Sequence, residues 1–279
     1  MAEHFEDRSF KRITDKFKIP MLKYLRYRYE MAKKFSTTIE VDKNTKQFLD
    51  YVIQIYEDVL TDLEFHSGDL RIEELGRYGT YKINLRVNSK KSVHQTILCT
   101  ANPKYSKRHL RINESEGMDF DIVFTQEDDA DEKIKILENA ISNHRQLTAT
   151  DIEIIYLTVA LYMKSNLSKS ELLLKIVDLT NQVEGLSEDE LYEIKVFQKA
   201  FMKKFIPDDD ELKGEIDNMI SMSDIEVMRA LFPKESKDER NAGIREGIIK
   251  TAKRMKEENF EISDISKATE LSPEEIEEL

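Results

Sequence analysis

The sequence predicts an α+β protein, in which a small mixed sheet flanked by helices is followed by a helical C-terminal half. Two observations lead to this prediction. Apolar residues recur every three to four positions over most of the chain, which is the spacing of amphipathic helices. Over a central stretch, residues 80–125, the spacing changes to an alternation of apolar and polar residues, which is typical of strands.

Composition excludes several classes of protein. A chain of 279 residues is long enough for one or two domains, and its 8 Gly and 5 Pro are too few for a collagen-like or low-complexity protein. The longest apolar stretch, residues 152–163, is too short to cross a membrane. The N-terminus has no apolar signal segment, and Cys99 has no second cysteine with which to form a disulfide. We therefore expect a soluble, cytoplasmic protein with no membrane partner.

The front half is expected to contain three helices and three strands. Helical spacing on both sides of Pro20 predicts two short helices or a kinked pair, and the same spacing over 45–65 predicts a long amphipathic helix. Period-two alternation over 80–87, followed by a polar turn and the β-branched run 93–100, predicts a hairpin. A third strand is expected at 119–125.

Helical patterns continue through the rest of the chain. Ser168 with Glu171, and Ser187 with Glu190, are capping boxes at the start of apolar-periodic segments. The helices expected here span 128–143, 151–163, 168–183 and 187–206, and two short helices follow before Phe232. The domains expected are an α/β domain at 1–128, an acidic helical region at 129–233 and a three-helix tail at 240–279, with a charged linker at 234–240.

The charge is distributed unevenly. Residues 1–111 carry 22 basic and 15 acidic side chains, whereas residues 112–279 carry 21 basic and 40 acidic ones. The segment 77–111 holds nine basic residues and no acid, which favours contact with a polyanion. The alternative is that this basic segment docks on the acidic half of the chain itself. The side chains expected to contact nucleic acid are Lys82, Arg86, Lys90, Lys91, Lys104, Lys107, Arg108 and Arg111.

The last 34 residues carry a recognisable pattern. A Glu246-Gly247 pair, with Ala252 and Met255 further along the same expected helix, is followed by an Ile-containing helix and the run Thr-Glu-Leu-Ser-Pro-Glu-Glu-Ile at 269–276. This segment resembles the C-terminal signature of the recombination-promoting nuclease and putative transposase family, which is part of the PD-(D/E)XK nuclease superfamily. In that family the run commonly has Gly where this chain has Glu270.

The resemblance implies a restriction-endonuclease-like sheet and a metal site with a definite pattern. An acid lies at the end of one strand, and acid-x-Lys or acid-x-Gln lies on its neighbour, because Mg²⁺ takes hard oxygen ligands next to the scissile phosphate. The strands expected at 80–87 and 93–100 carry no carboxylate. The sequence therefore predicts a divergent member that has lost its catalytic acids. The best-spaced acids elsewhere are Asp119 and Asp121, which are expected on one face of one strand.

Three functional hypotheses follow from these observations. The first is a catalytically degenerate, nuclease-like protein that binds nucleic acid through the basic hairpin and loop, with no metal or other cofactor. The second is a protein-interaction or regulatory module that forms a homo-oligomer. The third is an active endonuclease that uses Mg²⁺ at Asp119 and Asp121. Whether the protein is an enzyme stays open at this point.

Overall fold

The structure is a computed structural model that describes residues 5–40, 46–111 and 116–233, together with Ile249, Lys253, Lys256, Ile262, Ser266 and Ser272. The chain divides into two compact units, residues 1–227 and 228–279. The expected linker at 234–240 lies outside the described residues, and so does the expected three-helix tail apart from those six single positions.

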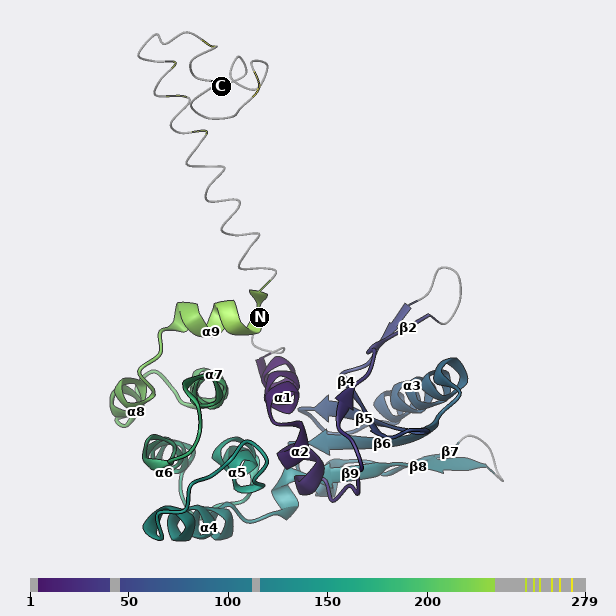
Figure 1. Ribbon diagram of the computed structural model, residues 1–279, viewed down its shortest axis with the longest axis horizontal. Helices are drawn as coiled ribbons and strands as arrows, with labels where there is room; N and C mark the ends of the chain where they lie inside the picture. Colours follow the sequence, from purple (N-terminus) through teal and green to yellow (C-terminus); the bar gives the residue numbers. More distant parts are fainter. Residues whose placement is uncertain are drawn as a thin grey trace. The chain divides into compact units, whose positions relative to one another are not determined.

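The first unit is built around a five-stranded mixed sheet with the strand order β1-β4-β5-β6-β9 (Figure 1). These strands are β1 Lys33–Lys34, β4 Tyr51–Tyr56, β5 Val59–His66, β6 Ser92–Cys99 and β9 Asp121–Phe124. The pairs β1·β4 and β4·β5 are antiparallel, whereas β5·β6 and β6·β9 are parallel. Since parallel neighbours need a crossover connection, helix α3 (Ile72–Ser89) joins β5 to β6. The α+β class and the mixed sheet that the sequence predicts are therefore confirmed.

Two small antiparallel sheets accompany the main one. Strands β2 (Thr38–Glu40) and β3 (Lys46–Phe48) form the first of them. Strands β7 (His109–Arg111) and β8 (Gly117–Asp119) form the second. Three short 3₁₀ helices lie at Pro103–Tyr105 (η2), Thr125–Glu127 (η3) and Ala160–Tyr162 (η4).

Two predictions for the front half are wrong. The long helix expected over 45–65 is instead strand β3 followed by the hairpin of β4 and β5, whose two-residue turn is Glu57-Asp58. Both faces of β4 and β5 are buried, so their apolar residues run almost continuously and imitate helical spacing. The strand expected over 80–87 is part of α3, whose buried residues Leu75, Tyr78 and Leu85 follow helical spacing.

The predictions for the other elements fare better. The two short helices are present as α1 (Phe5–Lys16) and α2 (Lys18–Tyr24), but the break between them lies at Phe17, and Pro20 is in the first turn of α2. The strand expected at 93–100 is β6, although it pairs in parallel with β5 and β9 and not in a hairpin. Both capping boxes are confirmed, at Ser168 and Ser187. The remaining helices are α4 Ala130–Ser142, α5 Glu153–Val159, α6 Lys169–Gln182, α7 Glu188–Phe205, α8 Lys213–Ile220 and α9 Asp224–Leu231.

Helices cover both faces of the sheet. On one face, α3 packs Leu75, Tyr78 and Leu85 against the strands. On the other face lies α1, which separates the sheet from the helical layer that contains α7 (Figure 1). The ring of Phe10 on α1 stacks on Phe65 of β5 at a centroid distance of 5.5 Å and meets Phe197 of α7 edge-on at 5.2 Å. Helix α1 thus joins the sheet and the helical layer through one aromatic core.

In the described part of the chain, no helix is long and apolar enough to span a membrane.

Candidate functional site

Two acidic residues lie opposite each other where strands β4 and β5 pair. Asp50 directly precedes β4, and the register Tyr51↔Leu63 brings it opposite Glu64. The backbone N–H of Asp50 donates to Oε1 of Glu64 at 3.3 Å, and Oδ2 of Asp50 accepts from the backbone N–H of Phe65 at 2.8 Å. The β-ladder itself therefore fixes the position of Asp50 relative to Glu64.

Glu64 belongs to a group of buried acids. It is 1% exposed, and Asp62, two residues earlier on the same face of β5, is 0% exposed. Burial raises the pKa of Glu64 well above its ordinary value, and the nearby carboxylates of Asp62 and Asp50 raise it further. Burial also raises the pKa of Asp62, to about 7. Nearby positive charge would favour the ionised form of both acids.

His66 continues this face of the strand by another two residues. Its Nδ1 lies 3.1 Å from the hydroxyl of Tyr78, which in turn accepts a hydrogen bond from Nη2 of Arg77 at 3.1 Å. Burial lowers the pKa of His66, so the imidazole is neutral at neutral pH. Its Nε2 atom is buried and has no hydrogen-bond partner among the described residues.

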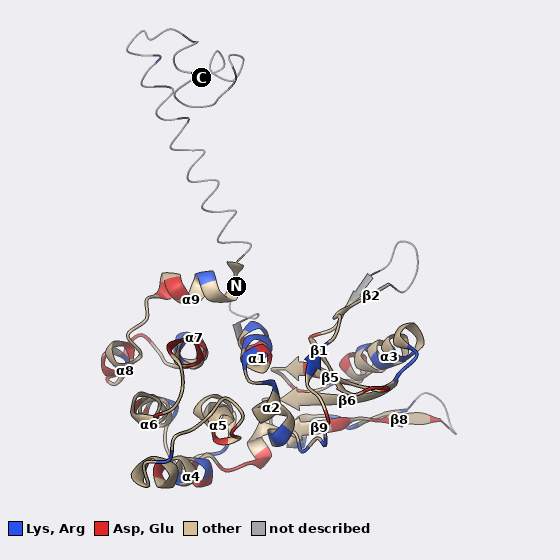
Figure 2. Cartoon of the chain, in the orientation of Figure 1, with Lys and Arg blue, Asp and Glu red and all other residues tan. Residues whose placement is uncertain are grey.

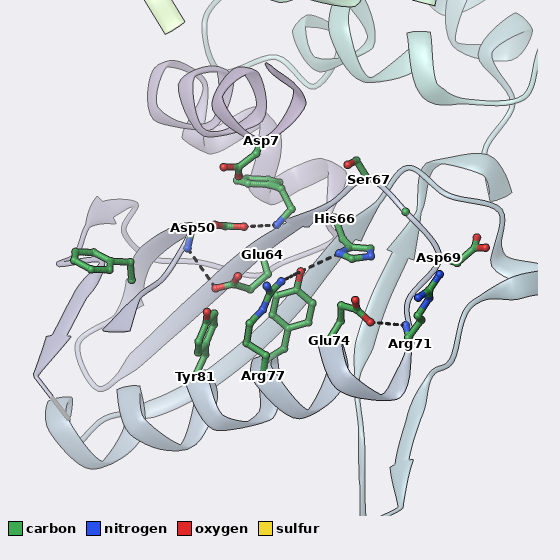
Figure 3. A pocket seen from close by; sticks show the side chains of 14 residues that line it. Asp7, Asp50, Glu64, His66, Ser67, Asp69, Arg71, Glu74, Arg77 and Tyr81 are labelled. Carbon is green, nitrogen blue, oxygen red and sulfur yellow. Dashed lines mark hydrogen bonds between the residues drawn. The ribbon is translucent and has the colours of Figure 1, made fainter. Parts of the chain in front are cut away.

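These side chains line a cavity of about 490 Å³ between the sheet and α3. Figure 3 shows Glu64 and His66 on the sheet side, facing Arg77 and Tyr81 of α3. A volume of this size suits a small-molecule ligand or one nucleotide of a longer chain. The lining residues outside the centre include Asp7, Phe48, Asp69, Arg71 and Glu74.

A lysine reaches Asp50 from α1. Nζ of Lys11 lies 2.9 Å from Oδ1 of Asp50 and 2.9 Å from Oδ2 of Asp7. Burial acts to lower the pKa of Lys11, but the two carboxylates outweigh it and hold this pKa above its ordinary value. Lys11 therefore stays charged and partly neutralises the acids at this end of the cavity.

The candidate metal ligands at the centre of the cavity are the side chains of Asp50 and Glu64. Among the described positions, no three Asp, Glu, His or Cys side chains are grouped so that they could enclose a metal ion. Mg²⁺ needs fewer than three protein ligands, since it usually binds one or two carboxylates and completes its coordination shell with water and substrate phosphate. The donor set of Asp50 and Glu64 therefore fits Mg²⁺ in ligand type and number.

The acids singled out from the sequence lie elsewhere. Asp119 ends β8, where it is largely exposed and lies 2.7 Å from Nδ1 of His109. Asp121 begins β9 in the main sheet and accepts a hydrogen bond from Thr96 at 3.0 Å. The expectation that both lie on one face of one strand is wrong, because the chain changes sheets between them at Phe120. Neither acid lines the cavity that Glu64 occupies.

The eight basic residues form two groups and not one hairpin. Lys82, Arg86, Lys90 and Lys91 lie towards or just beyond the C-terminal end of α3. Figure 2 shows Lys and Arg positions of this helix in blue. Lys104, Lys107, Arg108 and Arg111 lie in η2, β7 and the loop that connects them. A backbone hydrogen bond from Lys107 to Leu70 sets this loop near the beginning of α3. Strand β7, which ends with Arg111, packs against α3 itself, so the second group extends from the beginning of this helix along its side.

At least two of the basic residues are already engaged within the chain. Nζ of Lys91 donates a hydrogen bond to the backbone carbonyl of Glu57, and Arg108 pairs with an acid. Nη2 of Arg108 lies 2.5 Å from Oε1 of Glu127, and its guanidinium stands 4.7 Å from the centre of the Phe124 ring. This contact belongs to the alternative in which basic side chains pair with acids of the same chain.

Sequence reasoning missed Asp50 and His66 and left Glu64 at the end of an expected helix. A signal for the strands was present in the β-branched and aromatic runs on either side of Glu57-Asp58, since such runs around a short polar turn are typical of a hairpin. With that hairpin in place, Asp50 and the acid-x-His pattern at 64–66 fall on neighbouring strands.

No protein-family model, curated protein or solved structure matches the chain significantly.

Proposed function

We propose that this protein is a metal-dependent phosphodiesterase that cleaves nucleic acid and whose catalytic site contains Asp50 and Glu64. The observation that carries the proposal is that these two acidic residues lie opposite each other at the end of the β4·β5 pair, in a cavity that His66 and Arg77 also line. Two acids, a neutral imidazole and a guanidinium in one cavity are the side chains that phosphodiester hydrolysis uses.

The resemblance of the C-terminal segment supports the same reaction. It implies an acid at the end of one strand and acid-x-Lys or acid-x-Gln on its neighbour. Asp50 directly precedes β4, and Glu64 on β5 supplies the second acid. The chain departs from the pattern at His66, which stands where the family has Lys or Gln. The absence of acids from 80–87 and 93–100 does not exclude catalysis, because 80–87 is part of helix α3 and the acids lie on other strands.

A Mg²⁺ ion held by Asp50 and Glu64 would supply Lewis-acid activation of the scissile phosphodiester and of the attacking water. It would also balance the negative charge of acids whose ionisation is otherwise disfavoured by burial.

The other side chains have roles that follow from their positions. Lys11 holds one oxygen of Asp50 at 2.9 Å and thereby orients this carboxylate. The guanidinium of Arg77 suits the non-bridging oxygens of a phosphate because it presents several N–H donors in one plane. The neutral imidazole of His66 can accept or return a proton during attack and departure of the leaving group.

The test is a cleavage assay on supercoiled plasmid and on labelled single strands, with Mg²⁺ or with EDTA. Wild-type protein should cleave only with Mg²⁺, and Glu64→Gln should lower the rate roughly 100-fold or more, since metal activation contributes several kcal/mol. The matched control is Asp121→Asn, an acid of the same sheet outside the cavity, which should retain full activity. Cleavage that survives Glu64→Gln but disappears in Asp121→Asn would refute the assignment.

Binding without cleavage is the second candidate function. The specific observation in its favour is the ion pair in which Lys11 already occupies Oδ1 of Asp50. The cluster Lys82, Arg86, Lys90 and Lys91 would then provide the phosphate contacts, and reversing these four charges should lower DNA affinity and reduce the slope of its salt dependence. Salt-dependent binding of intact DNA, with no cleavage in any divalent cation, would favour this candidate.

A further inference from the structure

Two aromatic side chains line the cavity alongside the carboxylates. Phe48 ends β3, two residues before Asp50, and Tyr81 lies on α3 one turn after Arg77. Tyr81 packs edge-on against Tyr78 with a centroid distance of 6.1 Å, so its ring is held in place. Phe48 is 66% exposed, although it is one of the largest apolar side chains in the protein.

A single exposed apolar residue is ordinary on a protein surface and needs no explanation by itself. The position of Phe48 differs from that of Val87, which is 69% exposed on α3 and does not line the cavity that contains Glu64. Phe48 shares its cavity with a second aromatic ring, the guanidinium of Arg77 and the buried carboxylate of Glu64. The arrangement combines rings for stacking with a cation for phosphate.

Bases within a duplex are already stacked and paired, so they present no face to a side chain. Unpaired bases expose their faces to side chains. Proteins usually hold single strands by stacking these bases on aromatic residues, beside a cationic contact to the nucleic-acid backbone. A cavity of about 490 Å³ has room for one nucleotide at its centre, with neighbouring bases at the rim. Since several acids also line the cavity, phosphate contacts alone would bind weakly there, and the rings would contribute a larger share of the affinity.

We infer that the cavity takes single-stranded nucleic acid, or an unpaired segment of a duplex, with bases stacked on Phe48 and Tyr81 and the intervening phosphate beside Arg77. This inference rests on the proposed function for the identity of the site, and it adds the class of substrate. Phe48 and Tyr81 are thus specificity-determining residues, whereas Asp50 and Glu64 carry out the chemistry.

The test is fluorescence anisotropy with a labelled 15-nucleotide single strand and a hairpin duplex of the same sequence, measured in EDTA so that no cleavage occurs. Wild-type protein should bind the single strand at least roughly tenfold more tightly than the duplex. Phe48→Leu and Tyr81→Leu remove a ring but keep an apolar side chain, and each should lower single-strand affinity roughly 5- to 150-fold while leaving duplex affinity unchanged. Phe48→Trp, which keeps a ring, should retain the wild-type preference.

Tyr105 provides a matched control outside the cavity. It is 63% exposed and has the ammonium of Lys104 5.6 Å from its ring centre, so it offers the same pairing of ring and cation without the carboxylates. Tyr105→Leu should leave single-strand affinity unchanged. Because Phe48 is exposed, Phe48→Leu should fold normally, and a circular dichroism melt checks this for every variant.

The outcomes separate the inference from the proposed function. Equal affinity for both oligonucleotides, or single-strand affinity within twofold of wild type in Phe48→Leu and Tyr81→Leu, overturns the inference even if Mg²⁺-dependent cleavage is observed. Ring-dependent binding of single strands without cleavage in Mg²⁺ supports the inference for binding and refutes the phosphodiesterase.

Discussion

Truncation of Phe10 should destabilise the sheet and the helical layer together. The Phe10 ring is 2% exposed and contacts Phe65 of β5, Tyr162 of η4 and Phe197 of α7 at centroid distances of 5.5, 5.3 and 5.2 Å. Phe10→Ala removes a fully buried ring whose partners come from three different elements, so the cavity left behind cannot easily collapse. We expect the free energy of unfolding to fall by about 4 kcal/mol, within the range of roughly 3 to 5 kcal/mol for buried Phe→Ala substitutions.

Two measurements check this expectation. Urea unfolding followed by far-UV circular dichroism gives the loss of stability, and the melting temperature should fall by roughly 10 °C. Hydrogen exchange read by mass spectrometry should show lower protection in peptides of both β5 and α7, because α1 joins them. Phe48→Ala is the same truncation at a side chain that is 66% exposed, and it should cost less than about 0.5 kcal/mol.

A Phe10→Ala protein whose free energy of unfolding falls by less than about 1 kcal/mol would refute this role of Phe10. This role would equally be refuted by loss of protection in α7 alone, since that would mean that the sheet does not depend on α1.

Three further predictions concern the buried acids, a turn and a helix start. Burial raises the pKa of Asp62 from 3.8 to about 7, so between these pH values the native chain keeps a proton that the unfolded chain releases. The contribution of this group to the free energy of unfolding is therefore fully present below about pH 4 and is lost as the pH rises to about 7. Asp62→Asn should therefore be more stable than wild type at pH 8 in EDTA and gain little at pH 4. Urea unfolding measures both, and an equal difference in stability between variant and wild type at the two pH values would contradict this prediction. Gly185 has φ +95°, and an added Cβ would lie 2.5 Å from the carbonyl oxygen of Leu147. Gly185→Ala should therefore lower the free energy of unfolding by about 2 kcal/mol or more, and an unchanged melting temperature would contradict this. Ser187→Ala removes the side-chain acceptor for the backbone N–H of Glu190 at the start of α7 and should cost about 1 kcal/mol, with Ser187→Thr as the variant that keeps the cap.

The helices of the second half could be predicted because their signals are local. Ser168 and Ser187 each start a helix through hydrogen bonds within one turn, and no distant contact is needed to recognise them. The α+β class could be predicted for the same reason, since the strand at 92–99 is rich in β-branched residues.

The candidate site could not be predicted because it depends on pairing between strands. Residues of β4 and β5 are buried on both faces, so their apolar pattern does not distinguish strand from helix. Once 45–65 is taken as a helix, Asp50 and Glu64 lie almost four turns apart, and only the antiparallel register brings them together. The same error leaves Asp119 and Asp121 as the best-spaced pair of acids on the expected strands.

The expected contribution of the basic residues depends on a similar distinction. Spacing along the sequence groups 77–111 into one positive segment, whereas the fold distributes it between the end of α3 and the loop around η2. Charge counted along the sequence therefore predicts attraction to a polyanion, but it does not predict one continuous surface.

The most direct test of the central claim, that Asp50 and Glu64 form one metal-dependent site, is a Mn²⁺ titration monitored by the electron paramagnetic resonance signal of the unbound ion. Wild-type protein should show saturable binding, which Asp50→Asn and Glu64→Gln should each weaken at least roughly tenfold and Asp121→Asn should leave unchanged. Mn²⁺ binding of equal affinity in wild type, Asp50→Asn and Glu64→Gln would contradict the claim. The claim would also be contradicted if the wild-type protein showed no saturable Mn²⁺ binding, whether or not a single-stranded oligonucleotide was present.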